Sequence, residues 1–219
     1  IYDRYKCKNV LDFSAGWGDR LTGFYASDYG ELYVGIDPRK ENHPIYEKQV
    51  EFYQKHSTFF ENDKNHKFIC SPAEDANLSE YEGMMDIVFT SPPYFNVERY
   101  SHDDTQSWVR YKDIESWNKN FLHKALSNVW KTLRKGGLLM INISDVNASS
   151  GGKKSFGIKL FLTSISSKIS AATGRLVSLS LQADKTDPNI LLFLDKKYVK
   201  SKAPKAKKII PYSVPLFQN

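Results

Sequence analysis

Residues 86–100 read DIVFTSPPYFNVERY, and this stretch governs how the rest of the chain is interpreted. Its first part, residues 86–90, is apolar and β-branched, which is typical of a strand buried in a parallel sheet. Pro92 and Pro93 then fix two φ angles and remove two backbone donors, so the strand cannot continue. In open α/β sheets the carboxyl edge, where such a strand ends, is where ligands bind. The stretch therefore predicts a rigid loop, residues 91–94, over a binding site.

A strand followed by a glycine turn comes earlier in the chain. Residues 9–13 read NVLDF and lead into SAGWGDR at 14–20, after which apolar residues have helical spacing. This succession is typical of the start of a nucleotide-binding βαβ unit, in which Gly16 and Gly18 let the backbone approach a ligand. One glycine of the dinucleotide fingerprint is missing, and Asp12 ends the strand instead. A carboxylate there suits a ligand with a positive charge, such as an amino-acid ammonium group.

Acidic residues also follow the next two predicted strands. Asp37 ends the strand at 32–36, 25 residues after Asp12, where it can accept hydrogen bonds from both hydroxyls of a ribose. Glu74 and Asp75 follow the strand at 67–70, where a carboxylate can meet an adenine amino group or a ribose. Each acid alone is more often a cap or a surface charge. Three strand ends in succession, each with an acid or a glycine turn, predict a nucleotide-like ligand.

The loop at 91–94 suits chemistry on the exocyclic amino group of adenine or cytosine. That group is a poor nucleophile because its lone pair is delocalised into the ring. The Ser91 side chain and the Pro92 carbonyl could accept its hydrogens and localise the lone pair on nitrogen. Tyr94 could stack on the base, a contact worth about 1–3 kcal/mol in nucleic-acid sites. The alternative is a plain turn with an aromatic ring packed behind it.

The second half of the chain completes the predicted fold. Residues 96–112 are too long for a routine connection, so they form a functional flap, an ordered surface loop or a disordered segment. Their Arg, Tyr, Trp and Gln side chains suit contact with nucleic acid. We expect helices over 113–133 and 156–172 and strands over 138–143, 175–183 and 190–194. The predicted class is α/β, a doubly wound, Rossmann-like sheet of seven strands, mainly parallel, with a terminal antiparallel hairpin.

Composition indicates a globular protein with a basic end. The 219 residues include 14% aromatic and 26% charged side chains, which suits one domain with a sizeable core. Seven lysines and no acid lie between 196 and 208, and the rest of the chain has 24 basic and 25 acidic residues. We therefore divide the chain into a domain at 1–195 and a basic tail at 196–219. The tail either binds a polyanion or is a solvated terminus.

The same composition suggests where the protein works. Cys7 and Cys70 are the two cysteines, and they are not closely spaced in the sequence, which indicates reduced thiols and no disulfide framework. We therefore expect an intracellular protein, either cytoplasmic or located with DNA in a nucleoid or nucleus. No apolar run approaches membrane-spanning length, and no cysteine or histidine cluster predicts a metal site. A membrane partner and a metal are therefore not expected.

Together these motifs resemble the S-adenosylmethionine-dependent amino-methyltransferases of nucleic acids. DFSAGWG at 12–18 is similar to their cofactor loop, GIDP at 35–38 to the strand end with their ribose-binding acid, and TSPPY at 90–94 to their catalytic loop. The resemblance covers about residues 10–194. The order of the two loops resembles that in the gamma group of DNA methyltransferases. The amino-acid sequences of the two loops are also similar to those of small methyltransferases of phages and large DNA viruses. A serine at the first catalytic position is similar to many cytosine-amino enzymes, whereas asparagine or aspartate dominates adenine enzymes.

The resemblance implies methyl transfer from S-adenosylmethionine to the exocyclic amino group of cytosine or adenine in DNA. The base would be flipped out of the duplex or single-stranded. The implied catalytic residues are Ser91, Pro92, Pro93 and Tyr94. The implied cofactor-binding residues are Asp12, Ser14, Ala15, Gly16, Gly18, Asp37, Glu74 and Asp75.

Three alternatives remain open at this point. The acceptor could be a base in RNA, or the amide of a protein glutamine, although enzymes of the latter kind usually have asparagine in place of Ser91. A non-catalytic nucleic-acid-binding subunit is the third, but both loops look intact. No target-recognition domain is visible. Specificity would then come from residues 96–112, the basic tail, or an additional domain or partner.

Overall fold

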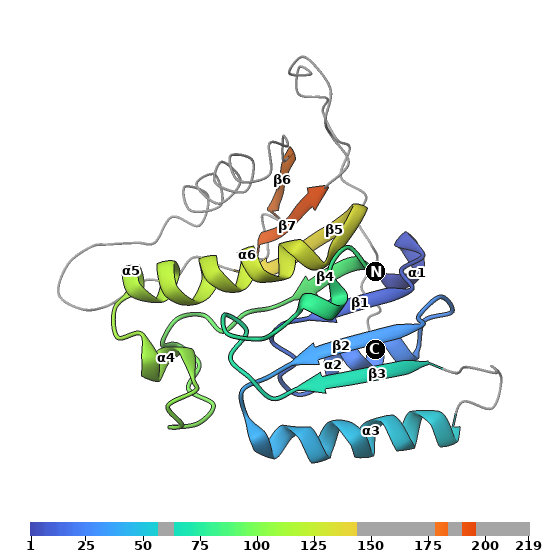
Figure 1. Ribbon diagram of the computed structural model, residues 1–219. Coiled ribbons are helices and arrows are strands. Elements are labelled where there is room, and N and C mark those ends of the chain that lie inside the picture. Colours follow the sequence, from blue (N-terminus) through green and yellow to red (C-terminus); the bar gives the residue numbers. More distant parts are fainter. Residues whose placement is uncertain (57–63, 144–177, 184–189, 196–219) are drawn as a thin grey trace.

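The computed structural model describes residues 1–56, 64–143, 178–183 and 190–195 (Figure 1). Its centre is a sheet in which five neighbouring strands are parallel, in the order β3-β2-β1-β4-β5. These strands are β1 (Asn9–Asp12), β2 (Leu32–Ile36), β3 (Asn65–Ile69), β4 (Met85–Thr90) and β5 (Leu133–Ile143). The α/β, Rossmann-like class predicted from the sequence is therefore confirmed.

Helices pack on both faces of this sheet (Figure 1). The core of one face includes residues of α1 (Tyr2–Tyr5), α2 (Asp19–Tyr25) and α3 (His43–His56). The core of the other includes η3 (Trp117–Leu122), which is π-helical, and α6 (His123–Thr132). The smaller helical elements are η1 (Lys40–Asn42), η2 (Ser79–Tyr81), α4 (Ser107–Arg110) and α5 (Ile114–Ser116).

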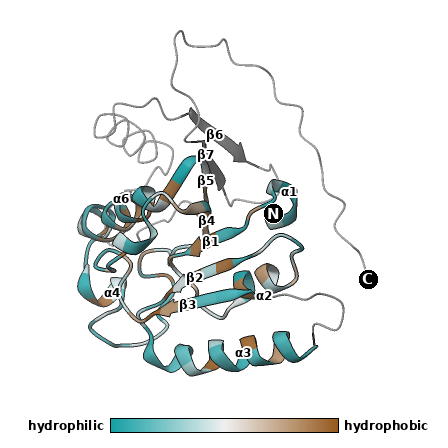
Figure 2. Ribbon diagram, turned by 45° about the vertical axis from the view of Figure 1, so that its right-hand side comes forward, coloured by the Kyte–Doolittle hydropathy of each residue, from teal (hydrophilic) through white to brown (hydrophobic). Residues whose placement is uncertain are grey.

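Two-sided burial explains why the strands read as continuous apolar runs. Neighbouring residues of a strand point to opposite faces, so Val10 packs with the α2–α3 core and Leu11 with the α6 core. Ile87 and Val88 of β4 divide in the same way, and all four side chains are fully buried. The outer helices need only one apolar face, and Figure 2 shows hydrophilic and hydrophobic colours mixed along α3.

The start of β5 differs from the prediction. The helix expected over 113–133 is the continuous run α5, η3 and α6, which ends at Thr132. The strand expected from residue 138 already begins at Leu133, which pairs with Met85, whereas Leu138 pairs with Ile87. The intervening residues form an irregularity that includes Gly136 at φ 81°. Gly136 and Gly137 therefore lie in the irregular start of a strand.

The end of the chain is described only in part. β7 (Ile190–Asp195) pairs antiparallel with β5, and β6 (Ser178–Ala183) pairs antiparallel with β7. Their connecting turn at 184–189, the helix expected over 156–172 and the tail at 196–219 lie outside the described residues. The seven-stranded sheet and the division at residue 195 therefore stay predictions.

Strand order places the ligand-binding edge. The chain leaves β1 towards β2 on one side, and β4 pairs with the other side of β1. This is the point where the strand order reverses, and in doubly wound sheets a crevice opens there at the carboxyl ends. The segments after β1 and β4 are the two loops that the sequence singled out.

Candidate active site

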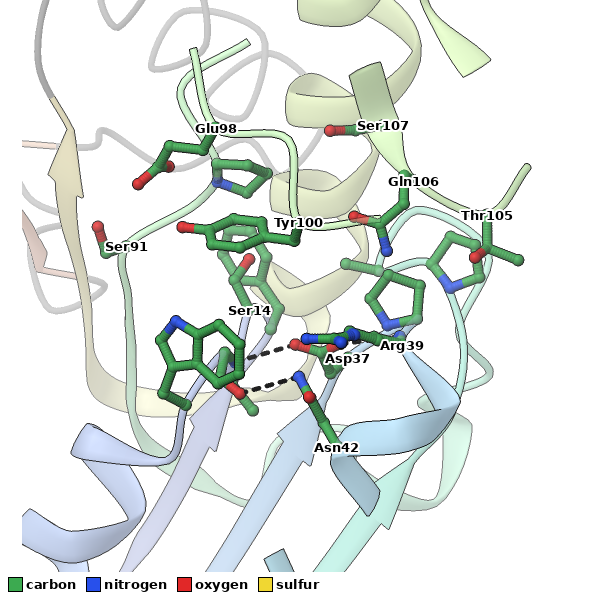
Figure 3. Close-up of a pocket in the computed structure, with 18 of the residues that line it drawn as sticks. Ser14, Asp37, Arg39, Asn42, Ser91, Glu98, Tyr100, Thr105, Gln106 and Ser107 are labelled. Carbon is green, nitrogen blue, oxygen red and sulfur yellow. Dashed lines mark hydrogen bonds between the residues drawn. The ribbon is translucent and has the colours of Figure 1, made fainter. Parts of the chain in front are cut away.

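A cavity lies at the carboxyl ends of the parallel strands (Figure 3). Segments following four strands contribute to its walls, and the long segment at 96–112 covers it. Its lining includes Ser14, Ala15, Gly16 and Trp17 after β1, Asp37 and Arg39 after β2, Pro72 and Glu74 after β3, and Ser91 and Pro93 after β4. The predicted cofactor loop and the predicted catalytic loop thus border one cavity.

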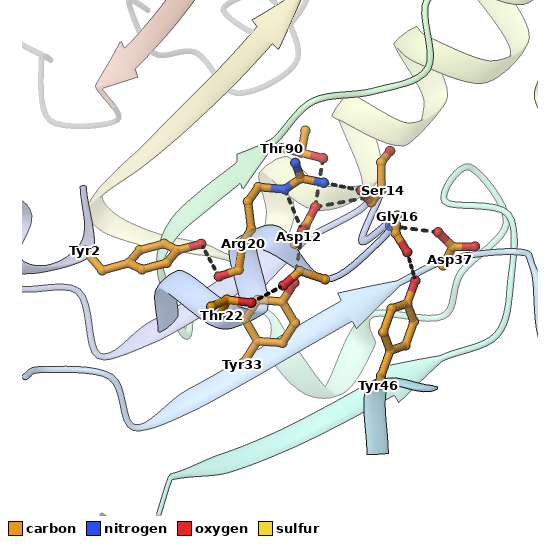
Figure 4. Close-up of polar contacts among 11 residues, drawn as sticks. Tyr2, Asp12, Ser14, Gly16, Arg20, Thr22, Tyr33, Asp37, Tyr46 and Thr90 are labelled. Atoms are coloured by element: carbon orange, nitrogen blue, oxygen red, sulfur yellow. Dashed lines mark hydrogen bonds and ion pairs between the residues drawn. The ribbon is translucent and has the colours of Figure 1, made fainter. Parts of the chain in front are cut away.

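The glycine turn after β1 is held open by its own contacts. Gly16 and Gly18 have φ values of 57° and 87°, a region that favours glycine. The Gly16 carbonyl accepts hydrogen bonds from Tyr46 Oη at 2.6 Å and Asn42 Nδ2 at 3.1 Å. Its amide donates to Asp37 Oδ2 at 2.9 Å, as Figure 4 shows. The turn is therefore rigid before any ligand arrives.

Asp37 combines burial with access to the cavity. Its carboxylate also accepts a hydrogen bond from the Arg39 amide at 2.8 Å, and the residue is only 8% exposed. Burial raises the pKa of this carboxyl above its ordinary value, although the amides of Arg39 and Gly16 oppose the shift. Its position at the end of β2, beside the glycine turn, is the one the sequence predicted.

Asp12 lies beneath the cavity and is not among the residues that line it. Its two carboxylate oxygens accept four hydrogen bonds within the protein (Figure 4). The donors are the Ser14 amide at 3.1 Å, Arg20 Nε at 2.7 Å, Tyr33 Oη at 2.9 Å and Thr90 Oγ1 at 2.9 Å. Asp12 is fully buried, so its link to the cavity runs through Ser14 and Arg20, which do line it.

The loop at 91–94, which the sequence predicts to be catalytic, has some residues at the cavity and others in the core. Ser91 and Pro93 line the cavity, whereas Pro92 is buried outside the lining. Tyr94 is half-buried and packs against the core on the α6 face, and its amide donates to Glu98 Oε2 at 3.2 Å. The next residue, Phe95, is buried with a φ of 48°, so the backbone turns sharply here. Tyr94 is therefore not among the residues that line the cavity.

The acids after β3 have different surroundings. The Glu74 side chain is 1% exposed, lines the cavity and accepts hydrogen bonds at Oε1 from Arg110 Nη1 at 2.6 Å and Tyr111 Oη at 2.8 Å. Its other oxygen, Oε2, is buried and has no hydrogen-bond partner among the described residues. Burial raises the pKa of this carboxyl. Asp75 is half exposed, lies outside the lining and pairs with Arg110 at 2.8 Å.

Residues 96–112 form an ordered cover over the cavity. The ion pairs of Arg110 and the hydrogen bond of Tyr111 fasten the end of this segment to the residues after β3. Of the alternatives left open above, disorder does not apply to this segment. It contributes several residues to the lining, namely Glu98, Tyr100, Thr105, Gln106 and Ser107.

Several lining residues were not singled out from the sequence. Trp17 and Tyr100 are large, exposed aromatic residues at the cavity, and Arg39 and Asn42 flank Asp37. The position of Trp17 between two glycines of a ligand loop was an available signal. For Tyr100 no local pattern could have indicated that the chain folds back towards Ser14. In the described part of the chain no cluster of potential metal ligands occurs, and none of its helices is long and apolar enough to cross a membrane.

Comparisons with known proteins identify relatives of the fold. No family model matches this sequence, and no curated protein matches it either. An rRNA methylase from Streptococcus thermophilus is 14% identical, with a TM-score of 0.52 over 87% of this chain and 88% of that chain. A SAM-dependent methyltransferase from Aquifex aeolicus is 13% identical, with a TM-score of 0.52 over 86% and 81%.

A third similar structure, a Streptococcus mutans protein in complex with SAH, is 12% identical, with a TM-score of 0.53 over 86% and 88%. Identities this low show a common fold and leave the activity to be argued from the site. The fold is one that SAM-dependent methyltransferases share with this chain.

Proposed function

We propose that this protein transfers a methyl group from S-adenosylmethionine to the exocyclic amino group of a cytosine or adenine base in DNA. The observation that carries this proposal is the convergence of Ser14 and Gly16, Asp37 and Ser91 on one cavity. These residues come from three strand ends far apart in the sequence. The shared fold described above supports the cofactor, and the chemistry of the SPPY loop supports the acceptor.

The residues at the cavity fit this cofactor. Glu74 Oε2 is a buried acceptor without a partner among the described residues, which suits the amino group of an adenine. Asp37 lines the cavity and suits the hydroxyls of a ribose, because its carboxylate accepts hydrogen bonds. The turn at Gly16 leaves room for a ligand to approach the backbone. When bound, S-adenosylmethionine supplies an electrophilic methyl group on a sulfonium.

On the acceptor side, the Ser91 side chain and the Pro92 carbonyl accept the amino hydrogens of the base. This would localise the lone pair on nitrogen and make it a nucleophile towards the methyl carbon. Transfer would form a carbon–nitrogen bond and break the carbon–sulfur bond, so S-adenosylhomocysteine would leave and the nitrogen would lose a proton to solvent. A strong general base is not required, because that proton is acidic once nitrogen carries the methyl group. Tyr94 and Pro93 shape the base site in this proposal.

DNA is the proposed acceptor polymer. RNA is the first alternative, because bases in single strands are directly accessible to such a site. A protein glutamine amide and a non-catalytic binding role are further alternatives. Ser91 and the basic tail favour nucleic acid over glutamine.

Incubation with methyl-labelled S-adenosylmethionine and separate DNA, RNA and protein pools tests the proposal. We expect label in DNA, on N4 of cytosine or N6 of adenine after digestion to nucleosides. Asp37→Asn should abolish labelling at limiting cofactor, whereas the control Asp28→Asn, at an exposed position between α2 and β2, should not. Label in RNA or protein alone would assign the acceptor to that class. Binding of nucleic acid without any transfer would refute the catalytic function.

A further inference from the structure

Two large aromatic side chains stand exposed at the cavity. Trp17 is 59% exposed and Tyr100 is 45% exposed, and both are among the lining residues. Their ring centroids are 6.3 Å apart with an interplanar angle of 77°, an edge-to-face contact. They come from the glycine turn after β1 and from the segment at 96–112. Two separate loops thus bring their rings together at one rim.

Trp17 is exposed on a rigid support. The neighbouring Gly16 is held by hydrogen bonds to Asp37, Asn42 and Tyr46, and the Trp17 carbonyl accepts a hydrogen bond from Gln49 Nε2 at 3.1 Å. The other three tryptophans differ, since Trp108 is half-buried and Trp117 and Trp130 are buried. Exposed aromatic surface at a cavity is typical of a binding site.

Tyr100 extends over the cavity towards the catalytic loop. Figure 3 shows its ring above Ser14, with the hydroxyl directed to the side on which Ser91 lies. Asp37 and Asn42 lie below the ring in the same view. The tyrosine hydroxyl is therefore directed to the side of the loop that would hold the acceptor base.

A cation accompanies the aromatic pair. The Arg39 guanidinium lies 5.5 Å from the centroid of the Trp17 ring, within the range of a cation–π contact. Its Nε is 3.5 Å from Glu41 Oε2 and has no hydrogen-bond partner among the described residues. Exposed rings beside a cation are the combination that single-stranded nucleic acids bind, through stacking and through the phosphate charge.

We propose that Trp17 and Tyr100 form a stacking site for an unpaired base of the acceptor strand at the rim of the cavity. The inference rests on the proposed function and adds a contact to it, distinct from the role given to Tyr94. A base has a π-face whatever its identity, so this site holds the strand without reading its sequence. The base held here neighbours the one presented to Ser91.

Binding of a mixed-sequence single-stranded DNA oligonucleotide, measured by fluorescence anisotropy, tests this site. Trp17→Ala and Tyr100→Ala should each weaken binding by about 5- to 150-fold, the loss expected for one stacking contact. Trp17→Phe and Tyr100→Phe keep a ring and should retain most of the affinity. Phe52→Ala removes a ring that is 57% exposed on α3, outside the cavity lining, and serves as the matched control.

Tryptophan emission provides a second readout. The oligonucleotide should quench wild-type emission, and Trp17→Phe should lose most of that response while still binding. Calorimetry with S-adenosylhomocysteine separates the rim from the cofactor site, because the alanine variants should lose at least five times more affinity for the oligonucleotide than for this ligand. An equal loss of both would overturn the inference and assign the rings to the cofactor.

The outcomes for the inference and for the proposed function are distinguishable. Wild-type methyl transfer to DNA, with oligonucleotide affinity unchanged in both alanine variants, would refute the stacking site and leave the function standing. Wild-type protein that neither binds the oligonucleotide nor transfers methyl to any pool would refute both. Unfolding curves that superimpose on the wild type exclude misfolding as the cause of a loss.

Discussion

Arg20 Nε lies 2.7 Å from Asp12 Oδ2 beneath the glycine turn, and this ion pair couples the cavity floor to the core. Asp12 is fully buried, and the Arg20 side chain is 18% exposed. Arg20 also donates to the Ser14 carbonyl, so the pair fixes the first residue of the turn. Breaking a buried pair leaves an uncompensated charge, which usually costs about 3–5 kcal/mol.

Asp12→Asn should therefore act mainly on folding. We expect a loss of about 3–5 kcal/mol in the free energy of unfolding, measured by urea denaturation. Thr90→Val removes only one of the four donors and should cost about 1 kcal/mol. A variant Asp12→Asn of wild-type stability that binds S-adenosylhomocysteine much more weakly would contradict this. It would favour the direct cofactor contact that the sequence suggested for Asp12.

The pH dependence of cofactor binding should report Asp37 and Glu74. Burial raises the pKa of each carboxyl above its ordinary value. A ligand that donates hydrogen bonds to both binds their ionised forms, so affinity falls as pH falls through the raised pKa values. Calorimetry with S-adenosylhomocysteine should show this loss beginning at a higher pH than ordinary carboxyls would give. A profile that keeps its shape in Asp37→Asn and Glu74→Gln would contradict the assignment.

The same two groups should affect stability with the opposite sign. A carboxyl whose pKa is raised on folding contributes stability below its unfolded pKa, and this contribution is lost as pH rises through the folded pKa. In the ligand-free protein, these two carboxyls therefore contribute most to the free energy of unfolding at acidic pH. Saturating ligand should reverse the pH dependence of this contribution, because the ligand binds the ionised carboxylates. Melting curves of wild type and Asp37→Asn, with and without ligand, measure the difference.

Short-range patterns in the sequence were enough to predict the fold class and the positions of several residues at the cavity. Continuous apolar runs located β1, β2 and β4, and the residues directly after these strands had to meet at one edge. Asp37 and Ser91 could be placed for that reason. Asp12 was placed at the right strand end, but its donors Arg20, Tyr33 and Thr90 are brought to it only by tertiary packing.

The position of aromatic rings could not be predicted in the same way. Tyr94 follows the prolines directly, yet its side chain packs against the core on the α6 face and is not among the lining residues. Tyr100 reaches the cavity because Arg110 and Tyr111 fasten its segment to Glu74. These contacts join residues 36 and 37 positions apart, and no local spacing encodes them.

The basic tail should act through phosphate charge. Deleting residues 196–219, which lie outside the described residues, should weaken DNA binding and flatten its dependence on salt. Replacing the seven lysines with glutamine should have the same effect while it keeps the length of the chain. Affinities measured at several salt concentrations give the slope. An unchanged slope in both variants would mean that the lysines are only a solvated terminus.

Variants of the proposed catalytic loop should change turnover without changing cofactor affinity. Ser91→Ala removes one acceptor but leaves the Pro92 carbonyl, so kcat should fall by about fivefold, the effect of one hydrogen bond. If the Tyr94 ring stacks on the base, Tyr94→Ala should have the larger effect. The fall in kcat/KM should then correspond to about 1–3 kcal/mol, the energy of one stacking contact. Neither change should reduce affinity for S-adenosylhomocysteine greatly.

Because Tyr94 packs against the core, Tyr94→Ala could lose activity through loss of stability alone. A further measurement therefore has to separate a role at the base from a role in packing. Tyr94→Phe keeps the ring and the packing, so it should keep both stability and turnover. If Tyr94 acts at the base, Tyr94→Ala loses turnover at temperatures well below its melting point. If the ring only supports the wall, turnover recovers fully once the variant is folded, and a different aromatic residue holds the acceptor base.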